Sequence, residues 1–150
     1  MQRIFLCLVA AALFFASCGA KRTIPSAEVW NVSQNKDILV LGAKGYGNKD
    51  ADAVTDAEQR AFRTLLFRGV PNTAYKLPLA PDGESAKQSF FDEFFSSGEY
   101  RNFITSSKVT APLQKNKDKN LKELALEVGI NTFSLRKHLE NEKVINKFGF

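Results

Sequence analysis

The sequence predicts an α+β fold, a small two-layer sandwich in which helices cover one face of a mainly antiparallel sheet. Three observations support this fold class. Residues 50–68 carry apolar side chains at helical spacing, and residues 121–131 alternate between apolar and polar side chains. Strand-like and helical segments also follow one another in the order strand, strand, helix, short helix, two strands and helix. That order favours a hairpin-rich sheet over regular βαβ units.

Two short strands are expected at the start of the folded region, at residues 28–33 and 37–42. The second segment, from Asp37 to Gly42, is an unbroken β-branched and aliphatic run. Such a run is typical of a strand that is buried on both faces. We therefore expect residues 37–42 to lie at the centre of the sheet, buried on both sides.

A long amphipathic helix is predicted over residues 50–68. Its apolar stripe consists of the small and aliphatic residues Val54, Ala57, Ala61 and Leu65. Phe62 and Leu66 widen this stripe. The sequence Gly69-Val70-Pro71 provides a left-handed glycine and then a proline that cannot continue a helix. Glu58 is the exception to the pattern, because it lies four residues after Val54 on the apolar stripe. We interpret it as a partner in an ion pair, with a catalytic carboxylate as the alternative.

Residues 71–84 form a predicted loop, which holds three of the five prolines. Ser85 to Gln88 resembles a capping box, so a short helix is expected from residue 85 to residue 96. Four aromatic rings gather on one broad side of this helix, at Phe90, Phe91, Phe94 and Phe95. Rings in such a cluster either pack in the core or form a docking surface for a protein partner.

A strand pair is predicted at residues 101–113 and 121–131, joined by the lysine-rich turn 115–120. In the second strand the apolar side chains of Leu124, Leu126, Val128 and Ile130 point one way. The other face carries polar residues, which indicates an antiparallel hairpin with one wet face. A last helix is expected to begin near residue 132 or 134 and to carry Leu135 and Leu139 toward the core. The apolar tail 144–150 is expected to pack back on the sheet.

A glycine-rich segment, Gly42 to Lys49, separates the second predicted strand from the long helix. Backbone amides at a helix N-terminus can hold an anion. Lys44 and Lys49 are therefore candidate anion-binding residues. The glycine spacing matches neither a dinucleotide-binding fingerprint nor a P-loop. The alternative is that these glycines allow a tight turn and a bulge.

The sequence offers little that would suit an enzyme. His138 is the only histidine, and we interpret it as a partly exposed residue on the surface of the last helix. No nucleophile motif and no metal-ligand spacing is recognisable, so we expect no catalytic residues, no metal and no cofactor. No small-molecule substrate is indicated either. The formal net charge of +5 is too mild for a typical nucleic-acid-binding protein.

The first eighteen residues have the pattern of an export signal. Arg3 supplies the positive charge, residues 4–15 are apolar, and the small residues Ala16 and Ser17 precede Cys18. The segment Phe15-Ala16-Ser17-Cys18 resembles the lipobox of bacterial lipoproteins. An ordinary cleaved signal remains the alternative, since small residues suit that peptidase too.

The lipoprotein resemblance implies a division of the chain into three parts. Residues 1–17 would be a signal peptide that is removed, residues 18–27 the lipidated Cys18 with a short tether, and residues 28–150 a single α+β domain. Cys7 would leave with the signal, so no thiol would remain free in the mature protein. Gly19, in place of an aspartate, implies transfer to the outer membrane.

The order of elements also resembles, more loosely, the small α+β domains of periplasmic accessory lipoproteins. Together these features predict an envelope protein held on the membrane by its lipid and facing the periplasm. We expect it to bind another envelope protein through residues 90–95, the loop before them, or an exposed strand edge. The alternative is a binder of an anionic envelope ligand such as peptidoglycan, through Lys44, Lys49 and the lysines of residues 115–120.

Overall fold

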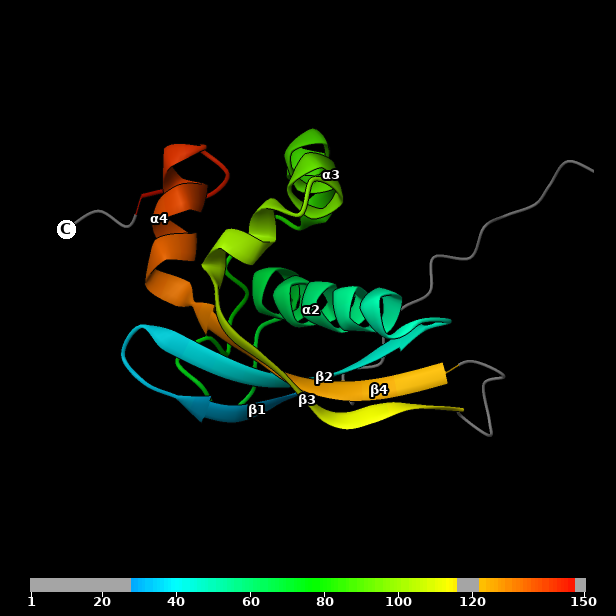
Figure 1. Ribbon diagram of the computed structural model, residues 1–150. Coiled ribbons are helices and arrows are strands. Elements are labelled where there is room, and N and C mark those ends of the chain that lie inside the picture. The colour runs from blue at the N-terminus through cyan, green and yellow to red at the C-terminus, as the bar shows by residue number, and fades with distance from the viewer. Residues whose placement is uncertain (1–27, 116–121, 148–150) are drawn as a thin grey trace, which may run out of the picture.

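The computed structural model describes residues 28–115 and 122–147 and confirms the small α+β fold (Figure 1). Four strands and three α-helices account for most of these residues, with two short 3₁₀ helices between α2 and β3. In chain order the elements are β1 (Val29–Gln34), β2 (Ile38–Gly47), α2 (Asp50–Phe67), η3 (Glu84–Lys87), α3 (Gln88–Ser96), η4 (Glu99–Phe103), β3 (Ile104–Lys115), β4 (Lys122–Asn131) and α4 (Thr132–Asn141). The predicted lipidation site, its tether and most of the predicted lysine-rich turn lie outside the described residues.

The sheet is antiparallel and has the strand order β1-β2-β4-β3. The prediction that residues 37–42 belong to a central strand is confirmed, because β2 pairs with β1 on one side and β4 on the other. The prediction that both faces of this strand are buried is wrong. Leu39 and Leu41 are fully buried, but Ile38 and Val40 are partly exposed. All three α-helices lie on the same side of the sheet, so the opposite face meets solvent (Figure 1).

The core lies between the sheet and α2. The alternation expected in the second strand of the hairpin is confirmed, since Leu124, Leu126, Val128 and Ile130 of β4 are all buried. They pair in register with the buried positions of β2, for example Leu41 with Val128. The apolar stripe of α2 covers them from above. This arrangement removes one complete face of the two central strands from water, which is the main source of stability in such a fold.

Residues 42–47 of the glycine-rich segment are strand rather than turn, which corrects the prediction for residues 42–49. The glycines in this part of β2 let other groups come close. A side chain at Gly45 would place its Cβ 2.7 Å from the Cβ of Ala57, and one at Gly42 would collide with the Trp30 ring. The missing side chain at Gly45 therefore lets α2 lie directly on the sheet.

The predicted end of the long helix is confirmed. Gly69 adopts a left-handed conformation with φ of 79°, and its amide donates to the carbonyl of Thr64 at 2.9 Å. The chain then turns into the long loop 70–83. Its backbone is fastened to the last turn of α2, because Leu79 donates to the Leu65 carbonyl at 3.2 Å and Ala80 to the Leu66 carbonyl at 2.8 Å.

The phenylalanine cluster belongs to the core, which confirms the first of the two alternatives for these rings and leaves little of them exposed as a docking surface. Phe91 and Phe94 are fully buried and Phe95 is 4% exposed, while Phe90 is half-buried. Their rings meet Phe62 and Phe67 of α2, and Tyr100, largely edge to face. These contacts dock α3 onto α2, so a partner could reach these rings only by unfolding that contact.

The predicted capping box at residue 85 is also wrong. Ser85 lies inside η3, and neither η3 nor α3 is capped by a side chain. The last helix is capped instead, because the Asn131 side chain accepts from the Ser134 amide at 2.9 Å. Helix α3 has no such cap, and the burial of its own aromatic face holds it in place.

The close contact between α2 and β2 predicts a strong effect of adding bulk at Gly45. We expect Gly45→Val to lower the free energy of unfolding by at least about 3 kcal/mol, because the side chain would have to push α2 off the sheet. Ala111→Val adds a valine to an exposed strand position and should change the stability by less than about 0.5 kcal/mol. Urea denaturation of both variants measures the difference. Equal stability of the two would contradict the close contact.

Candidate functional site

A groove of about 450 Å³ lies between the loop 70–83 and the end of α4. We call it the loop groove. One wall is formed by Leu77, Leu79 and Ala80, and the other by Val144 and Ile145, with Phe91 also lining it. Its volume lies in the range of sites that bind small molecules or groups of apolar side chains. Leu77 is 72% exposed, which is unusual for a leucine and places an apolar side chain at the edge of the groove.

The walls of the loop groove are held in place by hydrogen bonds to the body of the domain. Besides the bonds of Leu79 and Ala80 to α2, the Val70 amide donates to the Tyr75 carbonyl at 2.7 Å. The Tyr75 hydroxyl lies 2.7 Å from the Thr132 hydroxyl, and the latter lies 3.0 Å from the Asp37 carbonyl. The loop is therefore tied to α2, to the start of α4 and to the sheet. A binding site with fixed walls loses little entropy when a ligand binds.

Both basic and acidic side chains line the loop groove. Among its described lining residues, Lys87 comes from η3, Arg136 from α4 and Asp82 from the loop. Lys87 is exposed and Arg136 is partly buried. This combination of apolar walls and charged groups suits a ligand that is apolar on one side and polar at its margin.

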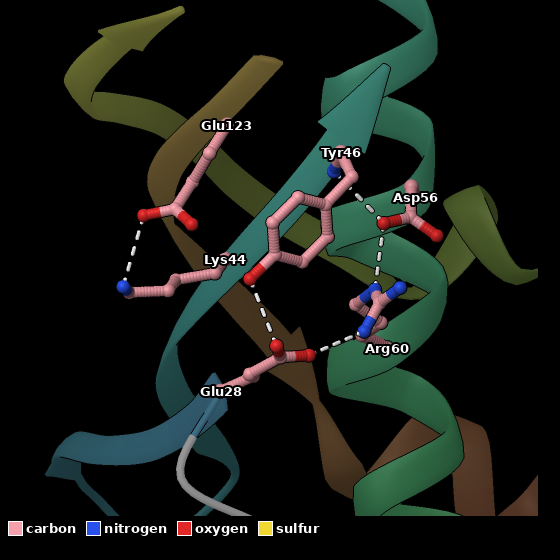
Figure 2. Close-up of polar contacts among 6 residues, drawn as sticks. All are labelled: Glu28, Lys44, Tyr46, Asp56, Arg60 and Glu123. Atoms are coloured by element: carbon pink, nitrogen blue, oxygen red, sulfur yellow. Dashed lines mark hydrogen bonds and ion pairs between the residues drawn. The ribbon is translucent and has the colours of Figure 1, made fainter. Parts of the chain in front are cut away.

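The candidate anion site is not assembled by the structure. The ammonium of Lys44 lies 2.9 Å from Glu123 Oε1 of the neighbouring strand, and the side chain points away from α2 (Figure 2). Lys49 is exposed at the start of α2, where the acidic residues Asp50 and Asp52 occupy the first turn. These carboxylates already interact favourably with the helix N-terminus, which leaves it less suited to an anion.

A cluster of polar side chains holds Glu28, the first described residue, against α2. Glu28, 6% exposed, contacts Arg60 at 2.5 Å and accepts from the Tyr46 hydroxyl at 2.8 Å (Figure 2). Asp56 holds the other side of the Arg60 guanidinium at 2.6 Å and accepts from the Tyr46 amide at 2.9 Å. The guanidinium also lies over the Tyr46 ring. Each charge in this cluster has a partner, so its geometry indicates a structural clamp.

Glu58 is the ion-pair partner that its position in the helix indicated. It is 5% exposed, and its carboxylate accepts from Arg101 Nε at 3.0 Å and from the Ser107 hydroxyl at 3.1 Å. The Tyr100 hydroxyl is 3.3 Å away. These contacts join α2 to η4 and β3. Burial, followed by the negative charge of Glu58, raises the pKa of Tyr100 above its ordinary value.

His138 lies on α4 and is partly exposed, as expected, while its ring packs against aromatic side chains. Its ring sits among Phe90, Phe94 and Phe103, and its side chain is 23% exposed. The Nε2 atom lies 3.3 Å from Glu99 Oε1 at an angle that does not make a hydrogen bond. In the described part of the chain, no group of three or more histidine, cysteine or acidic side chains is placed to hold a metal ion.

The β3 edge of the sheet offers less to a partner than the loop groove does. β3 forms one edge, and its pairing with β4 shifts register at three places. It also contains Lys108 and Pro112. Bulges, lysines and proline are features by which edge strands avoid pairing with other chains. Within the described ranges, no helix combines the length and the apolar character that crossing a membrane requires.

The loop groove was only partly predictable. The loop before residues 90–95 was one of three surfaces suggested for a partner, and its three prolines were the signal. The contribution of Val144 and Ile145 was missed, because the apolar tail was expected on the sheet. They reach the groove because the chain reverses after α4, where Lys143 has a positive φ of 55° and Val144 donates to the Leu139 carbonyl at 2.8 Å.

The environment of Tyr100 predicts that its hydroxyl ionises at a higher pH than an ordinary tyrosine. Its pKa is raised in the folded state, so it favours folding below the ordinary tyrosine pKa of about 10. This contribution is lost as the pH rises through the raised value. In an ultraviolet titration we expect Tyr100→Phe to remove a component that ionises above the ordinary tyrosine pKa. Loss of a component at or below that ordinary value would contradict the contact with Glu58.

The comparisons with known proteins add no relative to this description. No family model matches the chain, and no curated protein or solved structure matches it.

Proposed function

We propose that this protein is a lipid-anchored accessory or assembly protein of the bacterial envelope. It faces the periplasm from the outer membrane and binds another envelope protein through the loop groove. The observation that carries the proposal is the loop groove itself, about 450 Å³ in volume, with apolar walls and Leu77 72% exposed at its edge. An apolar surface of this kind is a common feature of protein-binding sites.

Two further features support this proposal over binding of an anionic envelope ligand. Lys44 is already paired with Glu123, and the start of α2 beside Lys49 carries Asp50 and Asp52. The loop groove, by contrast, exposes apolar side chains and keeps two basic residues at its margin. Such a mixed surface matches a protein better than a glycan, whose recognition depends on polar contacts.

The membrane part of the proposal depends on the resemblance of residues 15–18 to a lipobox. Glu28 is the first residue of the described domain and is clamped on α2 by Arg60 and Tyr46. With only residues 19–27 between Cys18 and this clamp, the lipid would keep the domain close to the membrane surface. The partner must then be accessible near that surface.

Cys18 is the residue on which membrane attachment depends. We expect Cys18→Ala to abolish incorporation of labelled palmitate and to leave a longer, unprocessed chain, because the thiol at the lipobox position is missing. Cys7→Ala removes the other cysteine and should leave both labelling and processing unchanged. Mass spectrometry of the chain purified from membranes measures both. Palmitate on the Cys18→Ala variant would contradict the proposal.

Binding through the loop groove is tested by changing its most exposed apolar residue. We expect Leu77→Asp to reduce copurification of the envelope partner at least about tenfold, which corresponds to 1.4 kcal/mol of binding free energy. Leu77 is exposed, so the domain should stay folded. Phe133→Asp is the matched control, because Phe133 is 57% exposed and does not line the groove. If both variants retain the partner, the groove is not the binding site.

A further inference from the structure

The three α-helices cover one face of the sheet and leave the other uncovered, and we call the uncovered side the open face (Figure 1). Successive side chains of a strand point to opposite faces. Val29 of β1 is buried on the helix side, so Trp30 belongs to the open face. Leu41 and Ala43 of β2 are fully buried under α2, so Gly42 between them also belongs to the open face. Trp30 and Gly42 are direct neighbours there, because the two strands pair at these residues.

The open face carries an indole ring whose place is set by the strand beneath it. A Cβ at Gly42 would collide with Cε2 and Nε1 of Trp30, so the ring covers the bare backbone of this glycine. Trp30 is nevertheless 40% exposed. Val32 of the same strand is 41% exposed. A large apolar side chain is therefore held against the sheet and still meets solvent.

The charges of β4 on the open face are matched by lysines. Glu123 and Glu127 alternate with buried leucine and valine residues and so point to the open face. The ammonium of Lys44 lies 2.9 Å from Glu123 Oε1. Lys108 of β3 stands opposite Glu127 in the strand pairing. With each carboxylate beside a lysine, this part of the open face can approach anionic headgroups without strong repulsion.

The proposed lipid anchor joins the domain close to Trp30. Only residues 19–27 separate Cys18 from Glu28, and nine extended residues span at most about 30 Å. Trp30 comes two residues after Glu28 in the chain. Phe133 is more exposed than Trp30, but it lies in α4, which follows the far end of β4. Among these two aromatic side chains, Trp30 is the one that a lipid on Cys18 brings near the membrane.

The chemistry of tryptophan matches a lipid surface. Its ring is apolar and its N–H is a hydrogen-bond donor, so it is enriched where headgroups meet acyl chains. We infer that the open face rests on the bilayer in the lipid-anchored protein, with Trp30 in the headgroup region. This inference rests on the proposed function, because it requires the lipid on Cys18. It adds an orientation in which α3 and α4, with the loop groove residues Phe91 and Arg136, face away from the bilayer.

The test uses the protein purified from membranes with its lipid and reconstituted into vesicles of phosphatidylethanolamine and phosphatidylglycerol. Trp30 is the only tryptophan of the chain, so its fluorescence reports on the open face alone. Lipids brominated just below the headgroups quench an indole only at contact distance. The control variant combines Trp30→Phe with Phe133→Trp, which moves the only tryptophan to an exposed position on α4. Phenylalanine keeps a ring over Gly42, so this variant should fold.

We expect brominated lipid to lower the emission of Trp30 at least about twofold and to leave the emission of the control variant nearly unchanged. The headgroup region holds the first indole and not the second. Acrylamide, which quenches from water, should show the reverse order and reduce the emission of the control variant more.

Equal quenching of the two tryptophans by brominated lipid would overturn the inference, because the domain would then turn no preferred face to the bilayer. Stronger quenching of the control variant would overturn it too, since the helix side would then touch the lipid. If Trp30 is not quenched while mass spectrometry finds lipid on Cys18, the orientation is wrong and the proposed anchor stands. If Cys18 carries no lipid and Trp30 is still quenched, the proposed anchor is wrong and the contact of the open face with lipid stands.

Discussion

The close packing of α2 on β2 is the contact on which the rest of the structure depends. Ala53, Ala57 and Ala61 are fully buried on the helix, and Gly45 is the strand residue that meets Ala57. Because all of these residues are small, the helix axis can approach the sheet closely and bury a complete face of it. The position of α2 then fixes the position of the phenylalanines of α3, which pack on its other residues.

Two polar networks hold α2 in register on either side of this contact. Glu28 and Asp56 share Arg60 near the start of the domain, and Glu58 joins the helix to η4 and β3. Buried carboxylates are costly unless their hydrogen bonds are satisfied, and both Glu28 and Glu58 have partners. These networks contribute to a defined orientation of the helix, since a rotation of α2 would leave several charges unpaired.

Helix α2 also connects the two parts of the proposed function, which are the lipid anchor and the loop groove. Its middle clamps Glu28, the first described residue, and its last turn holds the loop that forms one wall of the loop groove. A partner bound in the groove and a lipid attached to Cys18 would thus be linked through one rigid element. This arrangement suits a protein whose task is to hold a partner at a fixed place near the membrane.

The sequence by itself determined the α+β class, the long helix with its glycine end, the central position of residues 37–42 and the alternation of β4. These features follow from local periodicity and from the conformational preferences of glycine and proline. The proposed lipidation site at Cys18 also comes from the sequence, as a linear motif outside the described residues. The tertiary structure alone decided that the glycines of β2 receive a helix, that Phe91 and Phe94 are core, and that Lys44 pairs with Glu123. It also brought Val144 and Ile145 to the loop groove. Such outcomes depend on which surfaces meet across the fold, and no local pattern in a single sequence specifies the partner of a side chain distant in the chain.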